Sequence, residues 1–306
     1  MATPSSSSAR AQQQQELPDL RPTPTPRPIP PLDAVSVTGE APKWTRMPLR
    51  TRPHRNPLAE NDDEHPFSPD EVRRVHMGKY YPASGAASSP TPADTKGVEI
   101  ADIGCAFGGM LISLAPHFPT TKMMGLEIRT KVVSFAQGKT LALREASKTV
   151  APPPAAEGGA FHDYENLWFE QCNVMKYGTR FFTKGQLTRL FFAHPDPHWK
   201  RANVRRRIIS PGLVHVYAYW MRVGGLVYTV SDVPELEAWM IQCLDESPMF
   251  QRLTDAELEH DRTVLDIAVT TSEDAQRAQR KGLPKNFAVH RRINPEDKKA
   301  VVVPAV

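Results

Sequence analysis

Short apolar segments alternate with helical segments along this chain from residue 98 to residue 293, and this alternation limits the possible folds more than any other feature. Apolar runs of strand length predict buried strands at 98–104, 122–128, 167–174, 187–194, 224–232 and 286–293. Helices are expected at 108–118, 130–146, 203–221 and 235–247, the third in two pieces around Pro211. Strands that alternate with helices form a mostly parallel sheet covered on both faces, so the sequence predicts an α/β domain.

Proline marks the regions outside this domain. The chain has 30 prolines in 306 residues, well above the usual usage of about 5%. Residues 1–45 are low in complexity and cannot bury enough apolar surface to fold, so they are expected to be a disordered tail. Residues 46–97 are expected to form an N-terminal arm and a flexible loop, and residues 147–160 a flexible insertion. The folded domain is therefore expected at 98–293, with a C-terminal tail at 294–306.

Charge, cysteine content and hydropathy exclude some classes of protein. A net charge of +4 permits an anionic partner such as nucleic acid without requiring one. Three cysteines without a CxxC pair argue against a disulfide framework and for a reducing compartment. No apolar run reaches the roughly 18 residues of a membrane helix. The polar N-terminus lacks the apolar segment of a secretory signal, whereas an organellar transit peptide stays open as an alternative.

The first predicted strand runs into a glycine-rich loop, Gly104-Cys105-Ala106-Phe107-Gly108-Gly109. Glycines let a backbone approach a ligand closely, and the helix that follows offers free N–H groups. The second strand ends in Glu127, 23 residues past Gly104, at the distance expected for an acid that binds ribose hydroxyls. The spacing is G-x-x-x-G-G, with Ala106 where a nicotinamide fingerprint has its second glycine, so a methyltransferase is favoured over a dehydrogenase.

Two further strand ends carry polar side chains. Asn173 ends the third strand and can bind an adenine edge, although a plain turn residue is an equally good interpretation. Asp196 follows the fourth strand between two prolines, which hold its carboxylate rigidly where this fold does its chemistry. A simple Asp-Pro turn is one alternative. A metal site of His194, Asp196 and His198 is another, which we disfavour because the prolines prevent the helical spacing that brings two histidines to one metal.

Two clusters beyond Asp196 complete the candidate site. Five cations without an intervening acid follow Trp199, and they favour phosphate binding over a solvated helix face: Lys200, Arg201, Arg205, Arg206 and Arg207. In the segment 270–282, Thr271 and Asp274 have the spacing of a capping box, and Gly282 suits the end of a helix. An ordinary surface helix explains that segment as well as a functional one does.

Several of these motifs resemble one family, the catalytic subunit of the eukaryotic tRNA (guanine-N7)-methyltransferases. The resemblance covers about residues 46–293 and is carried by IADIGCAFGG (100–109), GLEIR (125–129), NVMK (173–176), KGQLTRLFFAHPDPHWKR (184–201), RIISP (207–211), RVGGLVYTVSD (222–232) and KNF (285–287), with RPHRNPLAE (52–60) in the arm. It implies a Rossmann-like class I methyltransferase with a seven-stranded sheet, S-adenosylmethionine as cofactor and no metal. It also implies methylation of N7 of a guanine in the tRNA variable loop, a WD-repeat partner subunit and a nuclear location.

The resemblance also implies roles for individual residues. The cofactor would be bound by Gly104, Cys105, Glu127, Ile128, Arg129, Asn173, Val174 and Ala193. Asp196 would be catalytic, and the tRNA would contact His198, Lys200, Arg201, Arg205, Ser272, Glu273 and Asp274. The chain departs from the family at Ala106, Val174, Ala193, His194, Ser272 and Asp274. A non-catalytic RNA-binding subunit with the same fold, or a methyltransferase of another RNA or of protein, remains the alternative.

Overall fold

A computed structural model describes residues 55–58, 80–81, 97–149 and 163–298 of the chain. The predictions of a disordered tail at 1–45 and of a flexible loop before the first strand lie outside these residues, as does the predicted C-terminal tail (294–306) beyond residue 298. The insertion expected at 147–160 begins later than predicted, because helix α5 (Thr130–Thr149) continues through the first three of its residues. In the part of the chain that the structure describes, no helix is long and apolar enough to cross a membrane.

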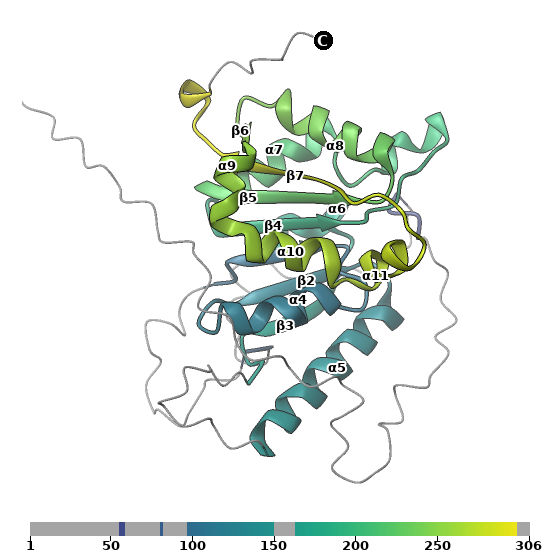
Figure 1. Ribbon diagram of the computed structural model, residues 1–306, viewed down its shortest axis with the longest axis vertical. Helices are drawn as coiled ribbons and strands as arrows, with labels where there is room; N and C mark the ends of the chain where they lie inside the picture. The colour runs from purple at the N-terminus through teal and green to yellow at the C-terminus, as the bar shows by residue number, and fades with distance from the viewer. Residues whose placement is uncertain (1–54, 59–79, 82–96, 150–162, 299–306) are drawn as a thin grey trace, which may run out of the picture.

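The core is a seven-stranded sheet with the order β3-β2-β1-β4-β5-β7-β6 (Figure 1). Its strands are β1 (Ile100–Ile103), β2 (Met123–Glu127), β3 (Leu167–Gln171), β4 (Leu187–Ala193), β5 (Met221–Ser231), β6 (Phe250–Arg252) and β7 (Asn286–Arg292). The first five strands run parallel, and β7 is antiparallel to both β5 and β6. The predicted Rossmann-like, mostly parallel seven-stranded sheet is confirmed.

The helices divide between the two faces of the sheet. They are α4 (Gly109–Leu114), α5, α6 (Val174–Tyr177), α7 (Pro211–Trp220), α8 (Pro234–Asp245), α9 (Asp255–Leu258), α10 (Arg262–Thr270) and α11 (Glu273–Arg280), with short 3-10 segments that include η7 (Arg201–Arg206). One apolar cluster packs the sheet against α7 and α8, and a second packs it against α4, α5 and α10. Phe191 and Phe192, adjacent in β4, point to opposite clusters, as the alternation of side chains along a strand requires.

Local sequence explains where the main helices begin. Gly108 precedes α4 with a φ of 79°, and a Cβ on it would lie 2.3 Å from the Phe169 ring, so only glycine fits both the turn and the packing. Ser210 caps α7 by accepting a hydrogen bond from the Leu213 N–H, and Pro211 is the first helical residue, as expected from the break at that proline. The predicted helix at 203–221 is therefore η7 and α7 with an extended link between them.

Candidate active site

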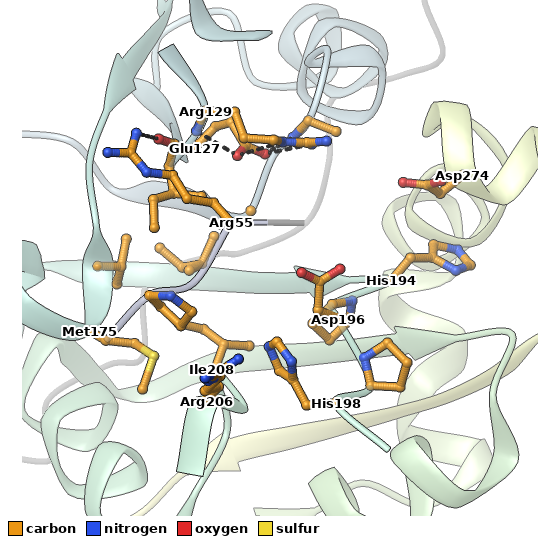
Figure 2. Close-up of a pocket in the computed structure, with 18 of the residues that line it drawn as sticks. Arg55, Glu127, Arg129, Met175, His194, Asp196, His198, Arg206, Ile208 and Asp274 are labelled. Atoms are coloured by element: carbon orange, nitrogen blue, oxygen red, sulfur yellow. Dashed lines mark hydrogen bonds and ion pairs between the residues drawn. The ribbon is translucent and has the colours of Figure 1, made fainter. Parts of the chain in front are cut away.

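A pocket of about 420 Å³ lies at the carboxyl ends of the parallel strands (Figure 2). Its walls come from the residues that follow β1, β2, β3, β4 and β5, from α11 and from the short described segment 55–58. Ligands of open α/β sheets bind at this edge, so the pocket lies where the sequence predicts it. Nine of the residues assigned to the site from the sequence line this pocket: Gly104, Glu127, Ile128, Arg129, Asn173, Val174, Asp196, His198 and Asp274.

The glycine loop has the backbone conformation of a ligand cradle. Gly104 has a φ of 79°, and no atom lies within 4 Å of the position that a Cβ would occupy on it. Ala106 has a φ of 47°, in the left-handed region that glycine adopts most easily. Cys105 is buried beneath the loop and does not line the pocket, and burial raises the pKa of its thiol well above the ordinary value.

The Glu127 carboxylate accepts four hydrogen bonds at the end of β2. One carboxylate oxygen accepts hydrogen bonds from the backbone N–H and the Nε of Arg129, at 2.9 and 3.0 Å. The other accepts from Nη2 of Arg129 at 3.0 Å and from the backbone N–H of Ala106 at 3.2 Å. A carboxylate has about four acceptor positions, so these four donors use its full capacity. The glycine loop and the end of β2 are thereby joined at one buried acid.

A segment that precedes the domain closes one side of the pocket. Asn173 donates through Nδ2 to the carbonyl oxygen of Pro57 at 2.7 Å. Arg55 donates through Nη1 to the carbonyl oxygen of Ile128 at 3.2 Å. Residues 55–58, the described part of the predicted arm, meet the two loops that would hold a nucleoside, with a turn at Pro57 and Leu58. The roles of Arg55 and Pro57 were not assigned from the sequence, because the arm has no periodicity and only the resemblance at 52–60 pointed to it.

The loop after β4 presents Asp196 to the pocket from between its two prolines. His194 and His198 on either side have φ values of 53° and 46°, an uncommon conformation that His tolerates better than most residues. Nδ1 of His194 lies 3.3 Å from Oδ1 of Asp232, which follows β5, and Nε of Arg207 donates to the Pro197 carbonyl at 2.9 Å. These contacts hold the loop on both sides of Asp196.

The lining of the pocket carries both positive and negative side chains. Four arginines and four carboxylates line it: Arg55, Arg129, Arg206, Arg277, Glu127, Asp196, Asp232 and Asp274. Burial lowers the pKa of Arg129, but the hydrogen bonds and charge of Glu127 and the charges of Asp196 and Asp274 outweigh it and raise that pKa. Among the described residues, no group of three or more His, Cys, Asp or Glu side chains could hold a metal ion. The metal alternative at His194, Asp196 and His198 therefore receives no support.

The basic cluster after Trp199 divides between the pocket and the solvent. Lys200, Arg201 and Arg205 are exposed on η7, whereas Arg206 lines the pocket. Arg207 lies over the Trp239 ring, with 4.9 Å between its guanidinium carbon and the ring centroid. The Trp199 side chain is 63% exposed at the rim, beside the exposed cations.

The last element of the site is α11, whose cap differs from the one expected. Ser272, not Thr271, is the N-cap, and its hydroxyl accepts from the Ala275 N–H at 3.0 Å. Thr271 is the C-cap residue of α10, and its hydroxyl and its N–H both donate to the Ile267 carbonyl. Gly282 ends the helix with a φ of 65°, as predicted.

Two pocket residues that the sequence analysis did not assign had a visible signal. Asp232 ends a strand at the same edge as Asp196, and Arg277 lies one helical turn after Asp274. Arg206 was predicted only as one of five phosphate-binding cations, and nothing in the sequence separates it from its exposed neighbours.

Comparison with known proteins agrees with this geometry. A family model described as "Putative methyltransferase" matches residues 96–288. Three similar relatives are each a tRNA (guanine-N(7)-)-methyltransferase. That of Arabidopsis thaliana is 43% identical over 80% of this chain and 90% of its own length. The enzyme of Mus musculus is 42% identical over 83% of this chain and 92% of its own length. The enzyme of Zea mays is 39% identical over 81% of this chain and 92% of its own length.

The fold also resembles that of a solved methyltransferase that is distant in sequence. A geranyl diphosphate methyltransferase in complex with S-adenosylmethionine is 13% identical, covers 67% of this chain and 81% of its own, and has a TM-score of 0.37. A likeness of this size bears on neither substrate nor mechanism.

Proposed function

Because this chain belongs to the family of the tRNA (guanine-N(7)-)-methyltransferases, it is an S-adenosylmethionine-dependent methyltransferase, and we propose that its methyl acceptor is N7 of a guanine in the variable loop of tRNA. The observation that carries this proposal is the match to such enzymes over about four fifths of the chain. The pocket at the carboxyl edge of the sheet, with Asp196 opposite the glycine loop, supplies a place for the reaction.

The described residues fit the cofactor. The open space beside Gly104 lets a ligand approach the loop backbone, and a side chain at that position would fill it. Glu127 and Asn173 place an acid and an amide at neighbouring strand ends, suited to ribose hydroxyls and to an adenine edge. Glu127 already uses its acceptor positions on Arg129 and Ala106, so ribose hydroxyls must take the place of the Arg129 guanidinium. We propose that the side chains of Glu127, Arg129 and Asn173 change their hydrogen-bond partners when the cofactor binds.

The cofactor supplies an electrophilic methyl group on a sulfonium. N7 of guanine carries a lone pair and no proton, so its attack on the methyl group does not need a general base. The protein therefore acts by positioning the purine. Asp196 is held at the ends of β4 and β5 by the contacts of its loop, and its carboxylate can accept hydrogen bonds from N1 and N2 of the guanine. Its negative charge then favours the positive charge that develops on the purine during transfer.

RNA would reach the pocket from the side of η7. Lys200, Arg201 and Arg205 are exposed there and can contact phosphates, and the exposed Trp199 ring offers a surface on which a base can stack. From the family resemblance we further propose a WD-repeat partner subunit and a nuclear location. The resemblance assigned His198, Ser272, Glu273 and Asp274 to tRNA binding as well, and of these only His198 and Asp274 line the pocket.

The direct test is incubation of total tRNA with labelled S-adenosylmethionine, followed by reduction and aniline cleavage, which cuts RNA at 7-methylguanine. We expect one cut in the variable loop, and the reaction should be run with and without a WD-repeat partner. Absence of cleavage in both reactions would refute the proposed acceptor. A non-catalytic RNA-binding subunit would instead bind tRNA without binding the cofactor, which calorimetry with S-adenosylmethionine alone distinguishes.

A further inference from the structure

Helix α11 carries pocket residues, yet it has little apolar surface to hold it in place. Only Ala275 and Ala278 are buried among its eight residues. Two buried methyl groups stabilise a helix by only about 1–2 kcal/mol. Asp274 and Arg277 of the same helix line the pocket, so their positions depend on whatever else fastens α11 to the domain.

Glu273, the first residue of α11, supplies such a contact. Its Oε1 lies 3.6 Å from Nζ of Lys139 on α5, and the two side chains are 34% and 14% exposed. A Cβ on Gly109 would lie 2.9 and 3.0 Å from the two carboxylate oxygens and 2.9 Å from the Thr271 carbonyl oxygen. The beginning of α11 is therefore seated on the first residue of α4, where only glycine leaves room for it.

The charge of Glu273 suits this place. Helix α4 has no acidic residue in its first turn, and Gly108 provides no side-chain cap for it. The first turn of a helix has free N–H groups and a partial positive charge, which a carboxylate stabilises. Oε2 of Glu273 is buried and makes no hydrogen bond to the described residues, so the carboxylate is held through its other oxygen, which pairs with Lys139. Since α4 directly follows the glycine loop, this contact joins α11 to the loop.

We propose that Glu273 is a positioning residue: together with Lys139 it fastens α11 to the glycine loop and thereby sets Asp274 and Arg277 at the rim of the cofactor pocket. The proposal rests on the function proposed above. It replaces the expectation, drawn from the resemblance, that Glu273 contacts tRNA, because the carboxylate points toward α4 and α5 and does not line the pocket.

The test compares Glu273→Gln, Lys139→Met and the double variant. Gln keeps the shape of Glu, so the first change removes the charge alone. We expect each single variant to weaken S-adenosylmethionine binding about fivefold by calorimetry, as for the loss of one partly buried charged contact, and the double variant to bind no more weakly than either. The KM for tRNA at saturating cofactor should stay within about twofold of wild type. Asp266→Asn is the matched control, since Asp266 is an exposed acid on α10 paired with Arg262, and it should change neither constant.

Two results would overturn the proposal. An unchanged cofactor Kd with a raised KM for tRNA would make Glu273 an RNA contact, and additive effects in the double variant would show that Lys139 is not its partner. A thermal melt of each variant separates these results from misfolding, and Glu273→Asp, which keeps the charge, should recover part of the lost affinity. The calorimetry does not depend on the acceptor, so a wild-type protein that binds the cofactor but leaves tRNA unmodified would refute the proposed function and still test Glu273.

Discussion

Replacing Glu127 by Gln tests the centre of the cofactor site, because the carboxylate accepts four hydrogen bonds of known geometry. The Gln side chain keeps one oxygen and turns the other into an NH₂ group, which would face two N–H donors. For the cofactor, the change replaces charged acceptors of two ribose hydroxyls by a neutral amide. Charged hydrogen bonds contribute about 1.5–3 kcal/mol each and neutral ones about 0.5–1.5 kcal/mol. Loss of the charge at two hydrogen bonds should therefore weaken the free energy of cofactor binding by about 2 kcal/mol.

A loss of about 2 kcal/mol corresponds to a cofactor Kd roughly 30-fold higher, which calorimetry with S-adenosylmethionine measures. Glu145→Gln on the exposed surface of α5 is the control and should leave the Kd unchanged. The companion variant Arg129→Met removes the guanidinium that occupies Glu127, so the cofactor should bind it no more weakly than wild type. If Glu127→Gln bound the cofactor within threefold of wild type, Glu127 would not be the ribose acid.

Three other substitutions have defined outcomes. Asp196→Ala should lower kcat severely and leave the calorimetric cofactor Kd nearly intact, and wild-type turnover in that variant would remove Asp196 from the mechanism. Burial raises the pKa of Glu237 from 4.5 to about 7, and the hydrogen bond from Thr229 opposes this shift only in part. Below the unfolded pKa of 4.5 the acid is protonated in both states and does not reduce the free energy of unfolding. As the pH rises toward 7, the unfolded state loses the proton first, so the fold becomes less stable. The Glu237→Gln variant should therefore be as stable as wild type in thermal melts at pH 4.5. At pH 8 its free energy of unfolding should be higher than that of wild type by on the order of 3 kcal/mol. A difference in stability that does not depend on pH would contradict this assignment. Ala106→Gly should stabilise the protein by about 0.5–1 kcal/mol, which amounts to about 2 °C in Tm, and a lower Tm would show that the left-handed backbone there is not strained.

Most of the sheet could be predicted because its strands are buried on both faces. Such strands are short runs with an apolar centre, and β1, β2, β3, β4 and β7 lie within the predicted limits. Strand β6 has only three residues, too few for a periodic signal. Helix α10 was not predicted, because RTVLDIAVT is rich in β-branched residues that favour strands. Its burial of Val264, Leu265, Ala268 and Val269 against the sheet outweighs that local preference.

The predictable part of the site has the same physical origin. Glu127, Asn173 and Asp196 follow parallel strands, and parallel strands bring their carboxyl ends to one edge. Arg55 and Pro57 reach that edge from a segment without periodicity, and the direction of a side chain such as Glu273 depends on contacts that lie far apart in the sequence. Sequence position therefore predicts which loops meet, but not which side of each loop faces the ligand.

Ala106 shows why a departure from the family pattern need not impair the site. Its φ of 47° lies in the region that glycine adopts most easily, since any side chain in that conformation costs about 1 kcal/mol. The functional group at this position is the backbone N–H, which donates to Glu127 at 3.2 Å and which alanine retains. The added methyl group thus affects the stability of the loop, whereas the acid that would hold the ribose keeps its orientation. We therefore expect Ala106 to leave the cofactor affinity unchanged, because the hydrogen bond from its N–H to Glu127 does not depend on the side chain.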